Sequence, residues 1–328
     1  MSDLLARLGL DHPIVQAPMA GGTTTPDLVI AVALAGALGS FGSAYQTPDD
    51  IRRDVGITRQ RTSRAFAVNL FLDRGRAATP DELARANAAL APERAALGLG
   101  PAPAPAPPPD LDLQIAALMD LAPPVFSSTF GAPDAGLVRD AKARGMVVIG
   151  TATSPEEVAI LDRRDVDAIV LQGAEAGGHR GTFAHEPAAG MFGVLALLSL
   201  ARRETSRPLI AAGGLMTRED VAAVLAGGAA AAQCGTAFLL ADEAGTLPAA
   251  RAALASSRAG RTALTRAFSG RLARGLDNST MRRFAALEAE IAPYPVQNAL
   301  TADLRKAAAA ANDPDRMAIW AGTGAALA

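Results

Sequence analysis

Short apolar runs alternate with amphipathic stretches along most of the 328-residue chain. Each run is bounded by glycine, proline or polar residues and lacks a polar/apolar alternation, which is typical of strands buried on both faces of a parallel sheet. We predict strands at residues 13–19, 38–44, 66–72, 124–130, 146–152, 168–173, 208–214 and 230–236. The helices predicted between them include 26–37 (with Thr25 as N-cap), 47–61, 133–144, 154–162, 187–203 and 217–226.

Eight strands that alternate with helices predict an α/β fold, a (β/α)8 TIM barrel, with an open doubly wound sheet as the weaker alternative. We assign residues 1–72, 110–241 and 313–328 to the barrel. The insertions at 73–109 and 242–312 are predicted to form a smaller, mainly helical substrate-capping domain over the strand ends. The alternative is a surface elaboration that does not contact substrate.

Both insertions carry helical patterns with interruptions. Residues 80–97 read as a helix, and the proline-rich stretch 100–109 reads as an extended connector that cannot join a sheet. In the second insertion we expect a loop at 268–278, and a helix end near Asn312 because the following proline disfavours helical backbone.

The sixth predicted strand leads directly into a glycine-rich loop. Gly173, Gly177, Gly178 and Gly181 surround a single histidine, His179. Missing side chains let a ligand approach the backbone, and an imidazole is suited to proton transfer near neutral pH. Active sites of barrels lie at the carboxyl ends of the strands, where this loop falls. We therefore predict that His179 is catalytic rather than a solvent-facing turn residue.

The seventh and eighth strands end in glycines that precede helix starts. Bare N–H groups after these two strands of a barrel commonly bind phosphate. Together with polar residues at the ends of strands three and six, these glycine loops predict a phosphate-bearing planar cofactor across the barrel mouth. The alternative is that the glycines are required only for close packing of the helices. The positions concerned are Asn69, Gln172, Ala212, Gly213, Gly214, Gly235 and Thr236.

The remaining histidines and the single cysteine carry weaker signals. His12 precedes the first strand, at the end of a barrel where residues serve stability. His185 is interpreted as a helix-entry residue, and Cys234 as a core residue within a strand rather than a reactive thiol. We predict no metal site.

The charge and composition of the whole chain limit the classes of partner that the protein is expected to bind. The net charge is −2 without a basic run and aromatic residues make up 4%, which argues against nucleic-acid binding. We find no signal-peptide pattern and no apolar run long enough to span a membrane. These features favour a cytoplasmic enzyme acting on a small molecule, with a homodimer as an open option.

The chain resembles the class I nitronate monooxygenases, formerly called 2-nitropropane dioxygenases. The similarity covers nearly the whole sequence. Its most specific parts are the Gly-Gly-His-Arg-Gly loop at 177–181, the Pro-Tyr-Pro sequence at 293–295 and the Trp-Ala-Gly sequence at 320–322. The matching segments are 13–21, 39–45, 66–71, 173–181, 209–215, 233–239, 269–275, 293–298 and 320–322. The barrel motifs alone are shared with flavin-type enoyl-acyl-carrier-protein reductases.

The resemblance implies an FMN enzyme and assigns roles by position. His179 would be the base that removes the α-proton of a nitroalkane. The implied flavin contacts are Ala17, Pro18, Met19, Asn69, Gln172, Gly177 and Gly178, and the implied phosphate cradle is Ala212, Gly213, Gly214, Gly235 and Thr236. Tyr294 would face the substrate. Thr129 and Thr323 stand where the family often has His and Gln, which puts the substrate preference in question.

The implied activity is oxidation of alkyl nitronates, and conceivably of nitroalkanes, by O2 to a carbonyl compound and nitrite. Two alternatives stay open. One is an NAD(P)H-dependent flavin reductase of enoyl thioesters or quinones, and the other is a non-catalytic barrel that binds flavin or phosphate.

Overall fold

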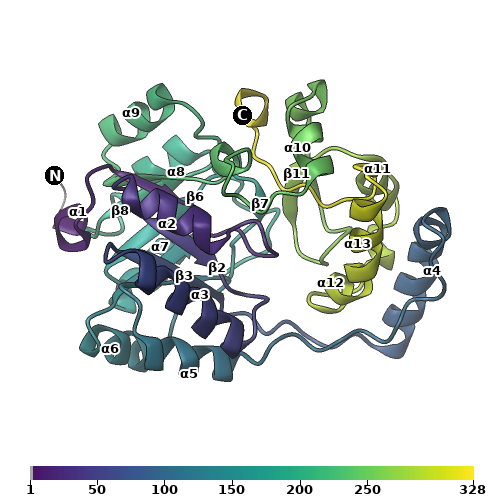
Figure 1. Ribbon diagram of the computed structural model, residues 1–328, viewed down its shortest axis with the longest axis horizontal. Coiled ribbons are helices and arrows are strands. Elements are labelled where there is room, and N and C mark those ends of the chain that lie inside the picture. Colours follow the sequence, from purple (N-terminus) through teal and green to yellow (C-terminus); the bar gives the residue numbers. More distant parts are fainter. Residues whose placement is uncertain (1–2) are drawn as a thin grey trace.

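The computed structural model describes residues 3–328, and its main element is a parallel sheet of eight strands that closes into a barrel (Figure 1). The first and last strands of the sheet, β1 and β2, meet through a bridge between Val15 and Leu38. The closure confirms the TIM barrel over the open sheet. The strands are β1 Ile14–Gln16, β2 Gly39–Gly42, β3 Phe66–Phe71, β4 Val125–Thr129, β5 Val147–Ala152, β6 Ala168–Gln172, β8 Leu209–Ala212 and β9 Ala231–Cys234.

Helices surround the barrel, and three of them begin at threonines that cap their first turns. The hydroxyls of Thr25, Thr47 and Thr217 accept the N–H groups of the first turns of α2, α3 and α9, which offsets the unpaired donors at a helix start. The helices around the barrel are α2 Pro26–Leu34, α3 Pro48–Arg61, α5 Leu111–Leu121, α6 Ala135–Ala143, α7 Pro155–Arg163, α8 Val194–Ala201 and α9 Arg218–Ala226.

The core leaves only one end of the barrel open for chemistry. One apolar cluster lies between strands and surrounding helices, and a second fills the barrel interior. Leu4, Leu5 and Leu8 of the short helix α1 (Asp3–Leu8) belong to the second cluster and cover the barrel at the amino ends of the strands. His12 lies at this same end, just before β1.

The two insertions pack against each other beside the strand ends. Helix α4 (Pro80–Ala96) at the far edge of Figure 1 shares an apolar cluster with Phe268, Phe284 and Leu304. The other elements of this part are α10 Pro248–Leu254, α11 Ser279–Ala285, α12 Val296–Leu300 and α13 Ala302–Ala310. Helix α13 ends before Asn312, as expected, and residues 106–109 of the proline-rich connector line the cavity described below.

The structure adds a small antiparallel sheet that the helical pattern of residues 242–312 does not predict. Strand β10 (Thr262–Thr265) pairs with β11 (Ala273–Leu276), and β11 pairs with β7 (Gly178–His179). The loop expected at 268–278 was therefore wrong over its second half. The strands are short, and β11 is paired on one side by the glycine loop of the barrel, which a local pattern does not reveal.

The helix predicted at 187–203 was also wrong at its start, since α8 begins only at Val194. The carboxylate of Glu175 accepts the N–H of Val194 at 3.0 and 3.1 Å and fixes that start. Residues 180–193 instead form a loop beside the barrel mouth. In the part of the chain that the structure describes, no helix combines the length and apolar character needed to cross a membrane.

Candidate active site

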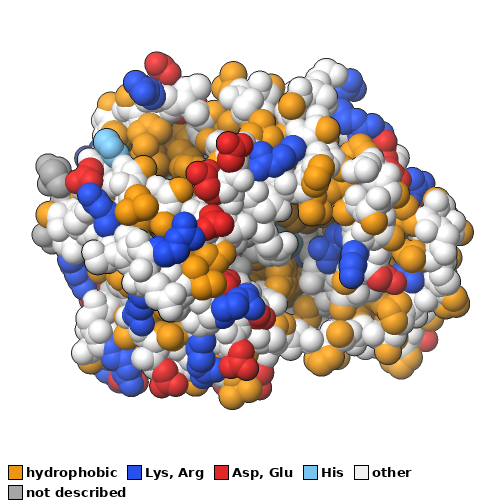
Figure 2. Space-filling view, viewed as in Figure 1, with side chains coloured by type: hydrophobic (Ala, Val, Ile, Leu, Met, Phe, Trp, Pro, Cys, Tyr) orange, Lys and Arg blue, Asp and Glu red, His pale blue; other side chains and the backbone are white. Residues whose placement is uncertain are grey.

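A cavity of about 1060 Å³ opens at the carboxyl ends of the barrel strands. Figure 2 shows the molecule hollowed between the barrel and α13, with basic side chains over α12 and α13 beside the hollow. The predicted residues that line it are Ala17, Pro18, Met19, Asn69, Thr129, Gln172, Gly177, Gly178, His179, Ala212, Gly213, Gly214, Gly235 and Thr236. The barrel thus gathers at one place residues that are spread over most of the chain.

The glycine loops after β8 and β9 leave backbone donors unused. Within residues 3–328, the N–H groups of Gly214, Gly235 and Thr236 donate to no protein acceptor. The nearby start of α9 is different, because the carboxylate of Asp220 already accepts its first N–H groups. A bound phosphate would therefore meet the loop amides rather than the helix terminus that the sequence suggested.

Glycine is required where the glycine loop meets the C-terminal segment. A Cβ on Gly177 would lie 2.5 Å from the Ala321 carbonyl carbon and the Gly322 nitrogen. The two segments can approach so closely only without that side chain. The N–H of Thr323 donates to the Glu175 carbonyl at 2.9 Å, and its side chain lies near Gly214. Thr323 thus sits beside the cavity but is not one of its lining residues.

Gln172 holds the loop that carries His179. Its Nε2 donates to the His179 carbonyl at 2.9 Å, and its Oε1 accepts the N–H of Gly181 at 2.8 Å. Asn69 donates to the hydroxyls of Ser127 and Thr129 at 3.0 and 3.3 Å. These amides line the cavity as predicted, but much of their hydrogen bonding is directed to the protein.

The His179 ring lies in an aromatic environment. Its centroid is 5.4 Å from that of Trp320, 5.9 Å from Phe130 and 6.3 Å from Phe71. Burial, with the positive charges of Arg271 and Arg305, lowers the pKa of His179 to about 3. The imidazole is therefore neutral at neutral pH and can accept a proton, although only weakly.

Sequence reasoning assigned no role to two neighbours of this ring. The hydroxyl of Ser269 lies 2.8 Å from His179 Nε2. Arg271 pairs with Asp73 and stacks over the Phe130 ring at 3.8 Å. The Ser-Gly-Arg piece at 269–271 was part of the family resemblance, and this was the only signal that could have marked it. Tyr294 packs on Phe130, with ring centroids 6.2 Å apart, and is not among the residues that line the cavity.

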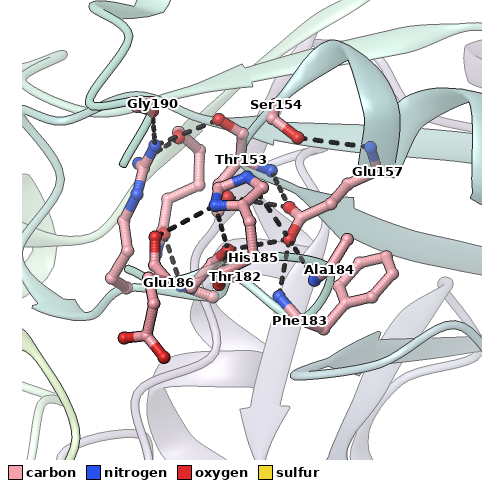
Figure 3. Close-up of polar contacts among 12 residues, drawn as sticks. Thr153, Ser154, Glu157, Thr182, Phe183, Ala184, His185, Glu186 and Gly190 are labelled. Atoms are coloured by element: carbon pink, nitrogen blue, oxygen red, sulfur yellow. Dashed lines mark hydrogen bonds and ion pairs between the residues drawn. The ribbon is translucent and has the colours of Figure 1, made fainter. Parts of the chain in front are cut away.

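The loop after His179 is anchored on a buried carboxylate, Glu157 (Figure 3). It accepts the N–H groups of Phe183 and Ala184 and the hydroxyl of Thr182. The His185 ring lies 4.0 Å from the same carboxylate. His185 is therefore part of this loop anchor, and its interpretation as a helix-entry residue was wrong because α8 starts nine residues later, at Val194.

Cys234 is buried in β9, and burial raises the pKa of its thiol to about 11. This confirms it as a core residue. Among the described residues, no cluster of three or more His, Cys, Asp or Glu side chains could hold a metal ion.

Comparisons with known proteins agree with this geometry. A family model described as nitronate monooxygenase matches residues 3–328. A probable nitronate monooxygenase of Staphylococcus aureus (strain Newman) is 37% identical over 327 residues, which are 99% of this chain and 92% of the relative. The chain belongs to the nitronate monooxygenase family. Members of this family are flavin-dependent oxidoreductases.

Solved structures place the same fold in two related groups. A nitroalkane oxidase from Streptomyces ansochromogenes superposes with a TM-score of 0.92 and 40% identity, covering 100% of this chain and 93% of the other. FabK from Thermotoga maritima superposes with a TM-score of 0.77 and 26% identity, covering 100% and 90%. The nitroalkane oxidase is thus the more similar of the two in both measures.

Proposed function

We propose that this protein is an FMN-dependent nitronate monooxygenase that converts alkyl nitronates and O2 to a carbonyl compound and nitrite. The single observation that carries the proposal is the cavity at the strand ends, where the unused amides of Gly214, Gly235 and Thr236 and the His179 ring line one space. The family match gives the reaction class, and the cavity gives room for a flavin and a small substrate.

The residues fit a flavin mononucleotide better than a dinucleotide. Gly213, Gly214, Gly235 and Thr236 form one phosphate cradle, and no dinucleotide fingerprint follows the first strand. Met19, Asn69, Gln172 and Gly178 would surround the ring and ribityl chain. When bound, the flavin supplies the redox chemistry, taking electrons from the substrate and passing them to O2.

His179 would act differently on the two ionisation states of the substrate. A nitronate is already deprotonated and needs no base. A neutral nitroalkane must first lose its α-proton, and the neutral imidazole of His179 is the group we propose to accept it. Its low pKa makes that transfer unfavourable, so the site is better suited to preformed nitronates. Trp320, Phe130 and Phe71 exclude water around the ring.

Matched kinetics on one carbon skeleton test the proposal. Purified protein should release FMN by mass analysis and should oxidise a nitronate without consuming NADH. His179→Asn should lower kcat/KM for the neutral nitroalkane by roughly 10²–10⁴-fold, the usual contribution of a positioned base, and affect the nitronate much less. His12→Asn, at the opposite end of the barrel, is the control. Release of FAD, or NADH-driven turnover without nitronate oxidation, would refute the proposal.

A further inference from the structure

Among the described residues that line the cavity, acidic side chains are absent and basic ones are present. No aspartate or glutamate is among its lining residues within the described chain, and its two cationic residues are Arg305 and Lys306 of α13. Lys306 is exposed to solvent, whereas Arg305 is half-buried. A cavity with cations and no carboxylate favours ligands that carry negative charge.

Arg305 is fixed in place but not neutralised. Its guanidinium donates to the carbonyl and the side-chain oxygen of Asn298, both at 2.9 Å, and to the Thr301 hydroxyl at 3.3 Å. In residues 3–328 no carboxylate lies within 4.0 Å of it. Burying a charge without a partner is unfavourable, so a counterion from the ligand would stabilise this arrangement.

Two other buried arginines near His179 differ from Arg305 because they do not line the cavity. Arg271 has Asp73 as its ion-pair partner. Arg180 donates to the carbonyls of Gln172, Thr153 and Gly190. Neither is a lining residue of the cavity. Arg305 therefore stands apart as a positioned cation that faces the ligand space without an ion pair.

Arg305 lies near the part of the barrel mouth that holds Tyr45 and His179. Its charge opposes the burial that raises the pKa of Tyr45, and it lowers the pKa of His179. Tyr45 follows β2 and packs on Phe71 of β3, which in turn packs on the His179 ring. The Thr301 hydroxyl that Arg305 contacts donates to the Phe268 carbonyl, and the Phe268 ring packs on Trp320 next to His179.

Tyr45 supplies a second polar group on the cavity wall. Its buried hydroxyl has no partner within hydrogen-bond distance among the described residues, with the Tyr294 hydroxyl near enough to affect its pKa. A buried hydroxyl without a partner is costly. A ligand oxygen between Tyr45 and Arg305 would satisfy both groups.

We propose that Arg305 and the hydroxyl of Tyr45 form an anion subsite that binds the negatively charged nitronate group and selects ionised substrate over the neutral nitroalkane. This inference rests on the proposed function. Arg305 is a specificity-determining residue in this scheme, because it touches the group by which the two ionisation states differ. The neutral nitroalkane offers the same oxygens with far less charge.

The test compares Arg305→Met, Arg305→Lys, Tyr45→Phe and the control Arg139→Met, which alters an exposed residue of α6 away from the cavity, in flavin-loaded protein. Arg305→Met should lower kcat/KM for the nitronate about 10–100-fold, as expected for a lost charged hydrogen bond, and change that for the nitroalkane much less. Arg305→Lys should recover most of the loss. Tyr45→Phe should show a smaller loss of the same kind, and Arg139→Met should change neither.

Binding of nitrite as an inert anionic probe gives a readout that is independent of turnover. Its dissociation constant, measured by titration calorimetry, should rise at least tenfold in Arg305→Met and recover in Arg305→Lys. Equal losses on nitronate and nitroalkane, unchanged nitrite binding, or loss of flavin from Arg305→Met would overturn the inference. If wild-type protein with full flavin oxidises no nitronate, the proposed function fails instead, and nitrite binding still reports on the subsite.

Discussion

At the scale of single residues, the contact between Ser269 and His179 decides which imidazole nitrogen is free. Ser269 is buried, accepts the N–H of Arg271 at 3.2 Å and lies within reach of the Arg271 carbonyl. If its hydroxyl donates to that carbonyl, His179 Nε2 carries the proton and Nδ1 has the lone pair. If the Ser269 hydroxyl donates to the imidazole instead, His179 Nε2 has the lone pair and Nδ1 carries the proton. Ser269 is therefore a positioning residue for the proposed base.

Ser269→Ala should lower kcat/KM for a neutral nitroalkane about 2–10-fold, since one neutral hydrogen bond is lost. The pH at which nitroalkane turnover falls should shift, while flavin content stays unchanged. Ser269→Thr should restore much of the activity. Ser128→Ala, which removes a buried hydroxyl of β4 without a partner in the described structure, is the control. An unshifted pH profile in Ser269→Ala would contradict the positioning role.

At the scale of elements, the loop of residues 180–193 depends on one carboxylate near the start of α7. Glu157 is fully buried and accepts five hydrogen bonds, two from Thr153 and one each from Thr182, Phe183 and Ala184 (Figure 3). Burial alone would raise the pKa of Glu157, but these donors outweigh it and lower the pKa. The ionised carboxylate therefore anchors the first part of this loop.

Glu157→Gln should destabilise the protein by about 1–3 kcal/mol. The amide nitrogen of glutamine would replace a carboxylate oxygen that accepts backbone N–H groups in the wild type, and those groups would lose their acceptor. Hydrogen exchange should quicken over residues 182–190 more than over the barrel strands. Glu156→Gln alters the exposed neighbour and should have little effect. Uniform acceleration of exchange across the barrel would show that Glu157 supports the core rather than the loop.

At the scale of the whole molecule, the packing of the insertions over the strand ends buries His179 and links its ionisation to folding. The ordinary pKa of this imidazole is 6.5, and in the folded protein it is lowered to about 3. Between these values the unfolded chain binds a proton that the folded protein does not. Stability from this group is therefore present above pH 6.5 and is lost as the pH falls through that window.

Wild-type protein should consequently lose more thermal stability between pH 7.5 and pH 5 than His179→Gln, which has no titrating imidazole at this place. Melting temperatures of both proteins across that range, by circular dichroism, measure the difference. His12→Gln, which removes an exposed histidine, should follow the wild type. Parallel curves for wild type and His179→Gln would mean that His179 takes up its proton equally in both states.

The sequence alone determined the features that depend on local chemistry. Strands buried on both faces, threonine N-caps and glycine-rich strand ends each have a signature within a few residues, so the barrel and most cavity-lining residues were predictable. The Pro-Tyr-Pro and Trp-Ala-Gly sequences made the resemblance to the nitronate monooxygenase family specific. Tyr294, expected to face the substrate, packs on Phe130 and is not among the lining residues of the cavity.

Only the tertiary structure decided what depends on contacts between distant segments. Ser269 meets His179 across 90 residues, and β11 pairs with the glycine loop across a similar separation. Glu175 fixes the start of α8 at Val194, and Glu157 holds residues 182–184, through hydrogen bonds formed only in the folded chain. The uncompensated charge of Arg305 likewise became visible only when the neighbours of its side chain were known, because charge pairing is a property of space rather than of sequence order.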